Sequence, residues 1–185
     1  MAELPADAGE VMCGIARAAI AARLSARDLR YENADSWLDT PGAAFVTLTL
    51  GGALRGCIGS LTAYRTLRED VAGNAVNAAF RDPRFPPLTS DELPRTHIEV
   101  SVLSEPEPYP FTDRADALAR LRPGVDGLIL EYAGHRGTFL PQVWEQLPDP
   151  DDFLAHLVRK AGLPAGWWDD RATLSRYTVT AFEEP

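Results

Sequence analysis

A hairpin pattern followed at once by a helical pattern limits the folds open to this chain more than any other feature. From Ala44 to Leu50 apolar and polar residues alternate, which is typical of a strand with one buried face. Gly51-Gly52 is a two-residue hairpin signal, and Ala53–Leu61 is predicted to be the partner strand. Apolar residues then recur at helical spacing over Thr66–Arg81, and Pro83 disfavours helical geometry at the residue before it.

The same order of patterns returns in the second half of the chain. Strands are predicted over Gly127–Tyr132 and Arg136–Leu140, joined across Ala133–His135. Pro141 suits the first turn of a following helix, and another helix begins at Asp149-Pro150. Hairpins interleaved with helices predict an α+β fold with a largely antiparallel sheet, and their recurrence hints at an internal duplication.

The remaining segments carry simpler patterns. At 185 residues the chain fits one domain, or a main domain with a small appendage. It contains no Gly-x-Gly-x-x-Gly and no Walker loop, so neither nucleotide-binding fold is predicted. The other predicted elements are a helix over Glu10–Ala26, a helical turn opened by Thr89 and Glu92, a strand over His97–Ser104, a helix over Asp113–Leu121 and a strand over Thr173–Phe182.

Charge and hydropathy narrow the class of function. The formal net charge of -9 argues against nucleic acid as a partner, because phosphate binding needs a surplus of Lys and Arg. It argues equally against an anionic membrane surface. No apolar run approaches the roughly 20 residues that span a bilayer, and the acidic start at Met1–Glu10 lacks the basic residues of a signal peptide. We therefore expect a cytoplasmic protein.

The sequence has two cysteines, Cys13 and Cys57. In the cytoplasm both thiols stay reduced. There is no Cys-x-x-Cys, no His-x-x-x-His and no Cys/His cluster, so no metal site and no cofactor is predicted. Cys13 falls inside a predicted helix, where we interpret it as a small buried apolar residue.

The unusual stretch of the chain is Leu54–Ser60, with the sequence LRGCIGS. Strand interiors normally avoid glycine, so two glycines indicate a bulge or the close approach of another backbone or of a ligand. Arg55 and Cys57 are two residues apart and share a face on a regular strand. A guanidinium near a thiol favours the thiolate, which makes Cys57 a candidate nucleophile and Arg55 its stabilising cation. Three further positions of the segment are candidate ligand contacts: Gly56, Gly59 and Ser60.

The register of this hairpin decides which way Cys57 points. A plain two-residue turn at Gly51-Gly52 sets Cys57 opposite Val46 on an apolar face and predicts a structural cysteine. A one-residue bulge at Gly56 or Gly59 turns Cys57 to the other side of the sheet. The sequence leaves both registers open. No motif places a histidine as the base for Cys57, since the three histidines fall in a strand start, a turn and a helix: His97, His135 and His156.

Other polar residues are candidates for binding or proton transfer, each with a plain structural alternative. Arg84 is a candidate to bind an anionic group, with Asp82 orienting it, although the proline-rich loop around them explains both as a rigid ion pair. Glu99 and Ser101 share a strand face, where a carboxylate serves as a general base or simply faces solvent. Gln142 stands at a predicted helix start that suits an anion, or is a surface amide.

Six stretches resemble, in this order, the AMMECR-type domain, also called protein A of the AmmeMemoRadiSam system. They are LRGCIGS at Leu54–Ser60, DPRFPPLT at Asp82–Thr89, IEVSVLS at Ile98–Ser104, GVDGLIL at Gly124–Leu130, GTFLPQVW at Gly137–Trp144 and FLAHLVRKAGL at Phe153–Leu163. The resemblance implies two intertwined strand–helix repeats around one barrel-like sheet with flanking helices, in a single domain over residues 1–185. It also implies a cleft beside the LRGCIG segment.

The family's molecular activity is unassigned, and two classes of function follow. Bacterial and archaeal members tend to be encoded beside a Memo-like protein and a radical SAM protein, which implies a shared pathway or complex. The first hypothesis is an enzyme that uses Cys57 as nucleophile or covalent anchor for a small anionic substrate, with Arg55, Arg84 and Glu99 assisting. The second is a non-catalytic scaffold that binds those partner proteins through the same surface.

Overall fold

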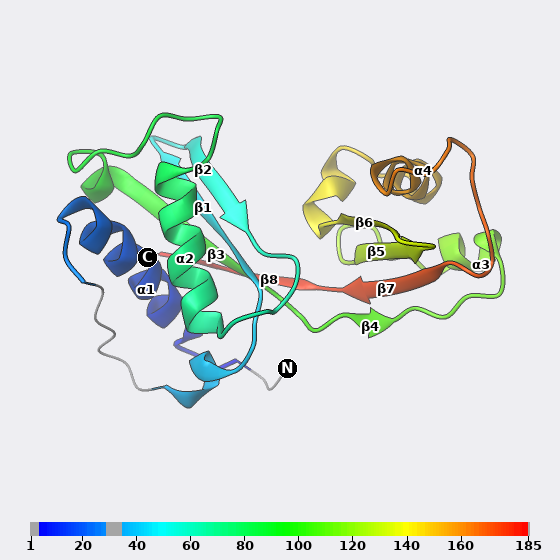
Figure 1. The fold of residues 1–185 in the computed structure, drawn as a ribbon, viewed down its shortest axis with the longest axis horizontal. Coiled ribbons are helices and arrows are strands. Elements are labelled where there is room, and N and C mark those ends of the chain that lie inside the picture. The colour runs from blue at the N-terminus through cyan, green and yellow to red at the C-terminus, as the bar shows by residue number, and fades with distance from the viewer. Residues whose placement is uncertain (1–3, 29–34, 185) are drawn as a thin grey trace. The chain divides into compact units, whose positions relative to one another are not determined.

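A computed structural model describes residues 4–28 and 35–184 of the chain. The chain divides into two compact units (Figure 1), the first made of Met1–Leu103 with Thr180–Pro185 and the second of Ser104–Val179. Each unit has a hydrophobic core of its own. Within the described residues, none of the helices is long and apolar enough to cross a membrane.

The first unit is a four-stranded sheet with two helices packed on one of its faces. Its strand order is β2-β1-β3-β8, and β1 pairs antiparallel with both of its neighbours. Helix α2 contacts β1 and β2, while α1 contacts α2 and β3 (Figure 1). The elements are α1 (Ala8–Leu24), η1 (Ser36–Asp39), β1 (Ala44–Leu50), β2 (Ala53–Gly59), α2 (Leu67–Phe80), η2 (Leu93–Arg95), β3 (Thr96–Leu103) and β8 (Val179–Glu183).

The helix face of this sheet is apolar because alternate strand residues point to it. Val46 and Leu48 of β1 and Ile98 and Val100 of β3 are fully buried there against the helices. Cys13 of α1 belongs to the same core, and burial raises the pKa of its thiol to about 11.

Helix α2 begins and ends where the local sequence predicts. The Thr66 side chain accepts a hydrogen bond from the Glu69 N–H, and the Glu69 carboxylate accepts one from the Thr66 N–H, which together form a capping box. The helix ends at Phe80, three residues before Pro83. Four of its nine buried residues are alanines, whose small side chains let α2 lie close to the sheet.

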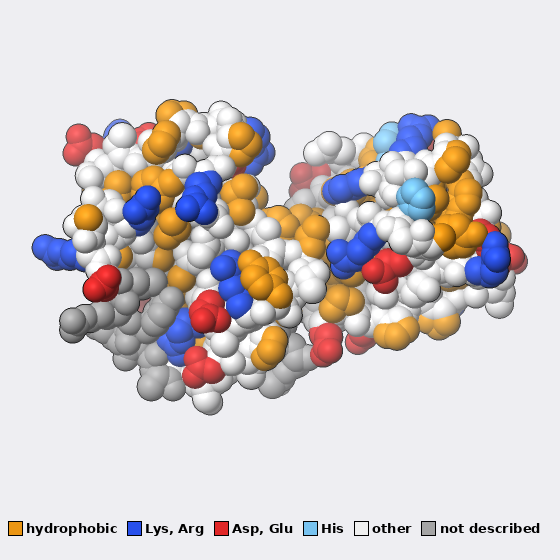
Figure 2. All heavy atoms as spheres, viewed as in Figure 1, with side chains coloured by type: hydrophobic (Ala, Val, Ile, Leu, Met, Phe, Trp, Pro, Cys, Tyr) orange, Lys and Arg blue, Asp and Glu red, His pale blue; other side chains and the backbone are white. Residues whose placement is uncertain are grey.

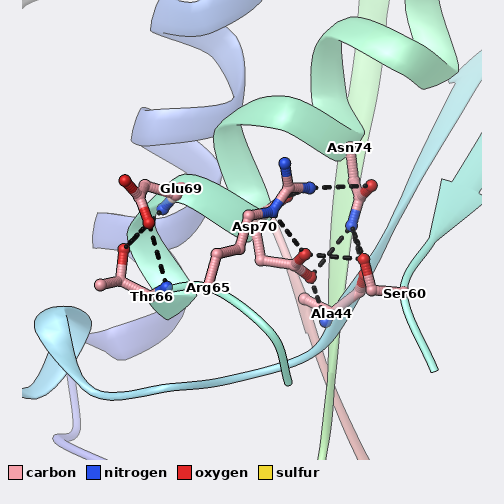
Figure 3. Close-up of polar contacts among 7 residues, drawn as sticks. All are labelled: Ala44, Ser60, Arg65, Thr66, Glu69, Asp70 and Asn74. Atoms are coloured by element: carbon pink, nitrogen blue, oxygen red, sulfur yellow. Dashed lines mark hydrogen bonds and ion pairs between the residues drawn. The ribbon is translucent and has the colours of Figure 1, made fainter. Parts of the chain in front are cut away.

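A buried polar network ties the start of α2 to the hairpin (Figure 3). The Asp70 carboxylate is fully buried and accepts hydrogen bonds from the backbone N–H of Ala44 at 2.8 Å and the hydroxyl of Ser60 at 2.7 Å. It also accepts from the Arg65 guanidinium at 2.8 Å and from the Asn74 amide at 3.0 Å. A single carboxylate thus joins the first residue of β1, the residue after β2 and the first turns of α2.

The second unit repeats the order of hairpin and helix. Its sheet has the order β4-β7-β5-β6, and its described pairings are antiparallel. Helix α4 packs on β6, and the ring of Trp144 stacks on that of Phe153 with centroids 3.7 Å apart. The elements are β4 (Glu107–Pro108), α3 (Arg114–Ala119), β5 (Gly127–Tyr132), β6 (His135–Phe139), η3 (Pro141–Glu145), α4 (Pro150–Lys160) and β7 (Thr173–Tyr177).

The α+β class and the largely antiparallel pairing are confirmed, but the barrel-like sheet is not found. Over residues 4–28 and 35–184 the strands form two separate four-stranded sheets, and neither closes into a barrel. The repeats are intertwined in the sense that the chain leaves the first unit after β3, builds the second, and returns to pair β8 beside β3 (Figure 1).

The predicted single strand over Thr173–Phe182 is wrong, because it is two strands in two different sheets. β7 pairs in the second sheet and β8 in the first. Between them, the Thr178 N–H donates to the Ser104 hydroxyl at 3.0 Å, and the Ser104 N–H donates to the Thr178 carbonyl at 2.9 Å. Alternation of apolar residues marks extended backbone but does not say which sheet a strand joins.

Candidate functional site

A bulge at Arg55 sets the direction of Cys57. Along β1, Thr49 pairs with Leu54 and Leu48 pairs with Gly56, so Arg55 has no partner of its own. Cys57 therefore pairs with Thr47 rather than with Val46. Of the two registers that the sequence leaves open, the structure has the bulged one, with the extra residue one position before Gly56. Cys57 lies on the sheet face opposite the helices.

The two glycines of the segment are explained by close packing within the protein. A Cβ atom on Gly56 would lie 2.2 Å from the carbonyl oxygen of Ala78 in α2, so the helix backbone occupies that space. A Cβ atom on Gly59 would lie 2.2 Å from the ring of Phe45. Gly56 thus lets the backbone of α2 pack against one face of the strand, and Gly59 lets the ring of Phe45 pack against the other.

Three side chains form a row across the face that carries Cys57. Thr47 pairs with Cys57 on one side and with Glu99 of β3 on the other. The Thr47 hydroxyl donates to the Cys57 sulfur at 3.3 Å. The Glu99 carboxylate accepts a hydrogen bond from the Ser101 hydroxyl at 2.9 Å. Cys57, Thr47 and Glu99 are all half-buried, so a polar row runs over the middle of the sheet.

Asp82 and Arg84 bind the backbone of Cys57 at the edge of the sheet. β2 is the edge strand of its sheet, and among residues 4–28 and 35–184 no other strand pairs with its outer backbone groups. The Asp82 carboxylate accepts from the Cys57 N–H at 2.9 Å, and the Arg84 guanidinium donates to the Cys57 carbonyl at 3.3 Å. Asp82 and Arg84 also pair with each other at 2.7 Å. The pair takes the place of a neighbouring strand and covers an edge that would otherwise pair with another chain.

This ion pair has one buried and one exposed member. Hydrogen bonds from Arg84, together with one from the Cys57 N–H, hold the pKa of the buried Asp82 carboxyl well below its usual range. The Arg84 side chain is 53% exposed, and its Nη1 makes no hydrogen bond within the described residues. Arg84 can therefore hold an external anion while it stays bound to Asp82.

In this structure the Arg55 guanidinium pairs with Glu92 and not with the Cys57 thiol. Its side chain is buried and forms a two-point ion pair with Glu92, both distances being 3.0 Å, and it also donates to the Pro86 carbonyl at 2.9 Å. The Arg55 hydrogen bonds, with those from Thr89, lower the pKa of Glu92 to about 2. The assumption that Arg55 and Cys57 share a strand face fails because the bulge breaks the alternation between them. The guanidinium that contacts Cys57 belongs to Arg84.

Two other predicted positions, Ser60 and Gln142, are found in other parts of the fold than the Cys57 row. The Ser60 hydroxyl is buried in the Asp70 network, which gives it a structural role (Figure 3). Gln142 is exposed on η3 of the second unit, and this five-residue 3-10 helix replaces the helix expected after Pro141. In the described part of the chain, a cavity of about 520 Å³ lies at the β5–β6 hairpin and another of about 520 Å³ lies between α1 and α2, and Cys57 lines neither of these.

Sequence reasoning missed Thr47 as a site residue. Its alternation within Ala44–Leu50 marks it as facing away from the core, but nothing local says that it meets a cysteine. Only the pairing of β1 with β2 and β3 brings Cys57, Thr47 and Glu99 into one row.

The family model described as AMMECR1 matches residues 13–182. The chain belongs to the AMMECR1 family. A protein from Methanothermobacter thermautotrophicus is 39% identical to it over 188 residues, which cover 99% of this chain and 97% of that protein. A protein from Saccharolobus solfataricus is 41% identical, over 98% of this chain and 84% of that protein.

A solved structure shows that this AMMECR1-family fold has been seen in another organism. The crystal structure of an uncharacterised protein from Pyrococcus horikoshii matches with a TM-score of 0.80 at 34% identity, covering 95% of this chain and 91% of that one. The names of these relatives state no activity, and the AMMECR1 family has no assigned function, so the likeness establishes fold and family.

The carboxylates that bind Arg55 and Arg84 predict a loss of stability in acid. Their pKa values are lowered on folding, so they stabilise the folded protein above their unfolded values near 4. That contribution should decline as the pH falls from about 4 through about 2, the folded value of Glu92. Urea unfolding between those pH values should show a shallower decline for Asp82→Asn and Glu92→Gln than for wild type. An unchanged pH slope in both variants would contradict this assignment.

Proposed function

We propose that the row of Cys57, Thr47 and Glu99, with Arg84 at its edge, is the active surface of this AMMECR1-family protein. Cys57 is the nucleophile or covalent anchor for a small anionic substrate. Arg84 holds the anionic group, which is the role that the sequence predicts for it, whereas Arg55, predicted to stabilise the thiolate, pairs with Glu92 instead. The observation that carries the proposal is the hydrogen bond from the Thr47 hydroxyl to the Cys57 sulfur at 3.3 Å, on a half-buried thiol.

The chemistry follows from the placement of these groups. The Cys57 sulfur accepts a hydrogen bond from Thr47, and the Arg84 guanidinium at the backbone of the same residue can bind an anionic group of the substrate. The sulfur adds to a carbonyl carbon of the substrate, so that the C–S bond forms as the C=O π bond breaks and its electron pair moves to the oxygen. The thiol proton passes to water and the oxygen takes a proton from water, so no leaving group departs. Two strand spacings, about 10 Å in all, separate Cys57 from Glu99. Glu99 therefore exchanges a proton with the far end of the substrate rather than with the thiol.

Alkylation kinetics test the proposal directly. At pH 7 we expect Cys57 to react with iodoacetamide faster than the free thiol of N-acetylcysteine. Cys13, which is buried, should stay unreacted in the folded protein. Thr47→Val should slow Cys57 by roughly twofold to tenfold, the range that one hydrogen bond supplies. Arg84→Gln should slow an anionic reagent such as iodoacetate more than neutral iodoacetamide. If Cys57 reacts no faster than N-acetylcysteine, the nucleophile role is lost.

A second proposal uses the same face to bind a partner. The helices pack on the opposite side of the sheet, and Phe45, Thr47 and Thr49 of β1 remain half-exposed. The family resemblance points to a Memo-like protein and a radical SAM protein as partners. Pull-down with each of them separates the proposals. Loss of binding in Glu99→Lys, with binding retained in Cys57→Ser and no turnover by wild type, supports the scaffold over the enzyme.

We place this activity in the cytoplasm. Both cysteines are free thiols in the structure, and the reducing cytoplasm keeps such thiols available for chemistry.

A further inference from the structure

The groove between α1 and α2 gathers arginines on a protein that is otherwise acidic. It has a volume of about 520 Å³. Four arginines and a single acidic residue, Glu69, line it, whereas the whole chain carries a net charge of -9. Basic side chains lie beside hydrophobic ones over α1 and α2 in the space-filling view (Figure 2). The arginines are Arg23, Arg27, Arg65 and Arg81.

Most of this positive charge is not neutralised within the protein. Arg65 pairs with Asp70. The side chains of Arg23, Arg27 and Arg81 form no hydrogen bond or ion pair with any part of the chain that the structure describes. Glu69 is occupied by the N–H and hydroxyl of Thr66 in the capping box. The three arginine side chains without a partner among the described residues give the groove a positive charge that attracts negative charge.

The floor of the groove is apolar, and its residues have small side chains. Ala19 and Ala22 come from α1, and Ala72, Gly73 and Val76 come from α2. Small residues in these positions let the backbone of another helix approach closely. An apolar stripe on the bound helix would pack favourably against the apolar floor.

The length of the groove favours a polypeptide over a small anion. Its α2 side runs from Arg65, just before the helix, to Arg81, just after it. The 14 residues of α2 between them extend about 21 Å at 1.5 Å per residue. Cations at both ends of a groove of that length match several turns of a helix with acidic flanks.

We infer that this groove docks an acidic amphipathic helix of a partner protein. The apolar stripe of that helix packs on the floor formed by α1 and α2, and its carboxylates pair with Arg23, Arg27 and Arg81. The α1–α2 surface and the Cys57 row lie on opposite faces of the first sheet, so the docking site is independent of the proposed chemistry. Association by ion pairs at an exposed groove is sensitive to salt.

A designed peptide tests the inference. The probe is a fluorescent 15-residue helix with an alanine and leucine stripe flanked by glutamates, compared with a scrambled peptide of equal composition. In fluorescence polarisation at low salt, wild type should bind the probe more tightly than the scramble. The triple variant Arg23→Gln/Arg27→Gln/Arg81→Gln should bind it at least about tenfold more weakly, because three exposed ion pairs are lost. Cys57→Ser should bind it as wild type does.

The matched control replaces exposed arginines outside the groove. The double variant Arg95→Gln/Arg159→Gln removes two positive charges, against three in the triple variant, from exposed sites that do not line the cavity. It should change the affinity less than twofold, and circular dichroism should show all variants folded. Three results overturn the inference: no binding of the probe at about 1 mM, equal binding by the triple variant, or displacement of the probe by pyrophosphate at equimolar amounts. A wild-type dimer that the triple variant loses in sedimentation would overturn it in favour of self-association.

Discussion

Replacing Asp70 with alanine is expected to lower the free energy of unfolding by about 3–5 kcal/mol, the range for breaking a buried ion pair by removing one partner. The Asp70 side chain is fully buried and accepts four hydrogen bonds, from the Ala44 N–H, the Ser60 hydroxyl, the Arg65 guanidinium and the Asn74 amide. Its loss leaves the buried Ala44 N–H and Ser60 hydroxyl without their acceptor and weakens the link between α2 and the hairpin (Figure 3).

Urea unfolding followed by circular dichroism measures this effect. The neighbouring acidic residue supplies the control, because Glu69 is exposed and serves only to cap α2. Glu69→Ala should cost about 0.5–2 kcal/mol, as the loss of a cap does. Equal losses for Asp70→Ala and Glu69→Ala would show that the network in Figure 3 is not what joins α2 to the hairpin.

Replacing Gly56 with alanine is expected to cost roughly 3 kcal/mol or more, at the upper end of the cost of overpacking a core. The added Cβ would lie 2.2 Å from the Ala78 carbonyl oxygen and 3.0 Å from its carbon. Those are backbone atoms of α2, so the clash is relieved only by moving the helix. The variant should also alter the alkylation rate of Cys57, since the neighbouring residue of β2 is displaced.

Two other glycines calibrate the measurement. Gly59→Ala should cost less than Gly56→Ala, because its Cβ meets the side-chain ring of Phe45, and a ring can turn aside. Gly14→Ala should gain about 0.5–1 kcal/mol, because Gly14 lies inside α1 with no atom within 4 Å of the added carbon. A Gly56→Ala protein as stable as wild type would mean that α2 does not lie against β2 at this point.

Local patterns predicted the elements because each pattern is short and repeats within its own segment. The alternation in Ala44–Leu50 and the apolar spacing after Thr66 gave β1 and α2 with nearly the observed bounds. The prediction of one strand over Thr173–Phe182 was wrong for the same reason. The local pattern is extended on both sides of Thr178 and does not show that β7 ends before it and β8 begins after it. The barrel-like sheet failed because closure depends on pairing between distant strands.

The candidate site depended on a feature that local patterns do not encode. One extra residue at Arg55 reverses the face of every later residue in β2, so Cys57 meets Thr47 instead of Val46. The partner of Arg55 was equally undetermined, because Glu92 is 37 residues away along the chain. Asp82 and Arg84 are two residues apart and pair with each other. Their contacts with the Cys57 backbone join residues that are 25 and 27 positions apart in the sequence, respectively, so local patterns do not predict them.

The amino-acid sequence alone determined the fold class and the AMMECR-type resemblance, and it predicted the segment that carries the candidate thiol. Those properties rest on periodicity and on short contiguous motifs, whose physical causes act over a few neighbouring residues. The tertiary structure decided which face carries Cys57, which guanidinium reaches it and where unpaired arginines gather between α1 and α2. Strand register and ion-pair choice are settled by the free energy of packing distant segments together, and a single bulge changes both.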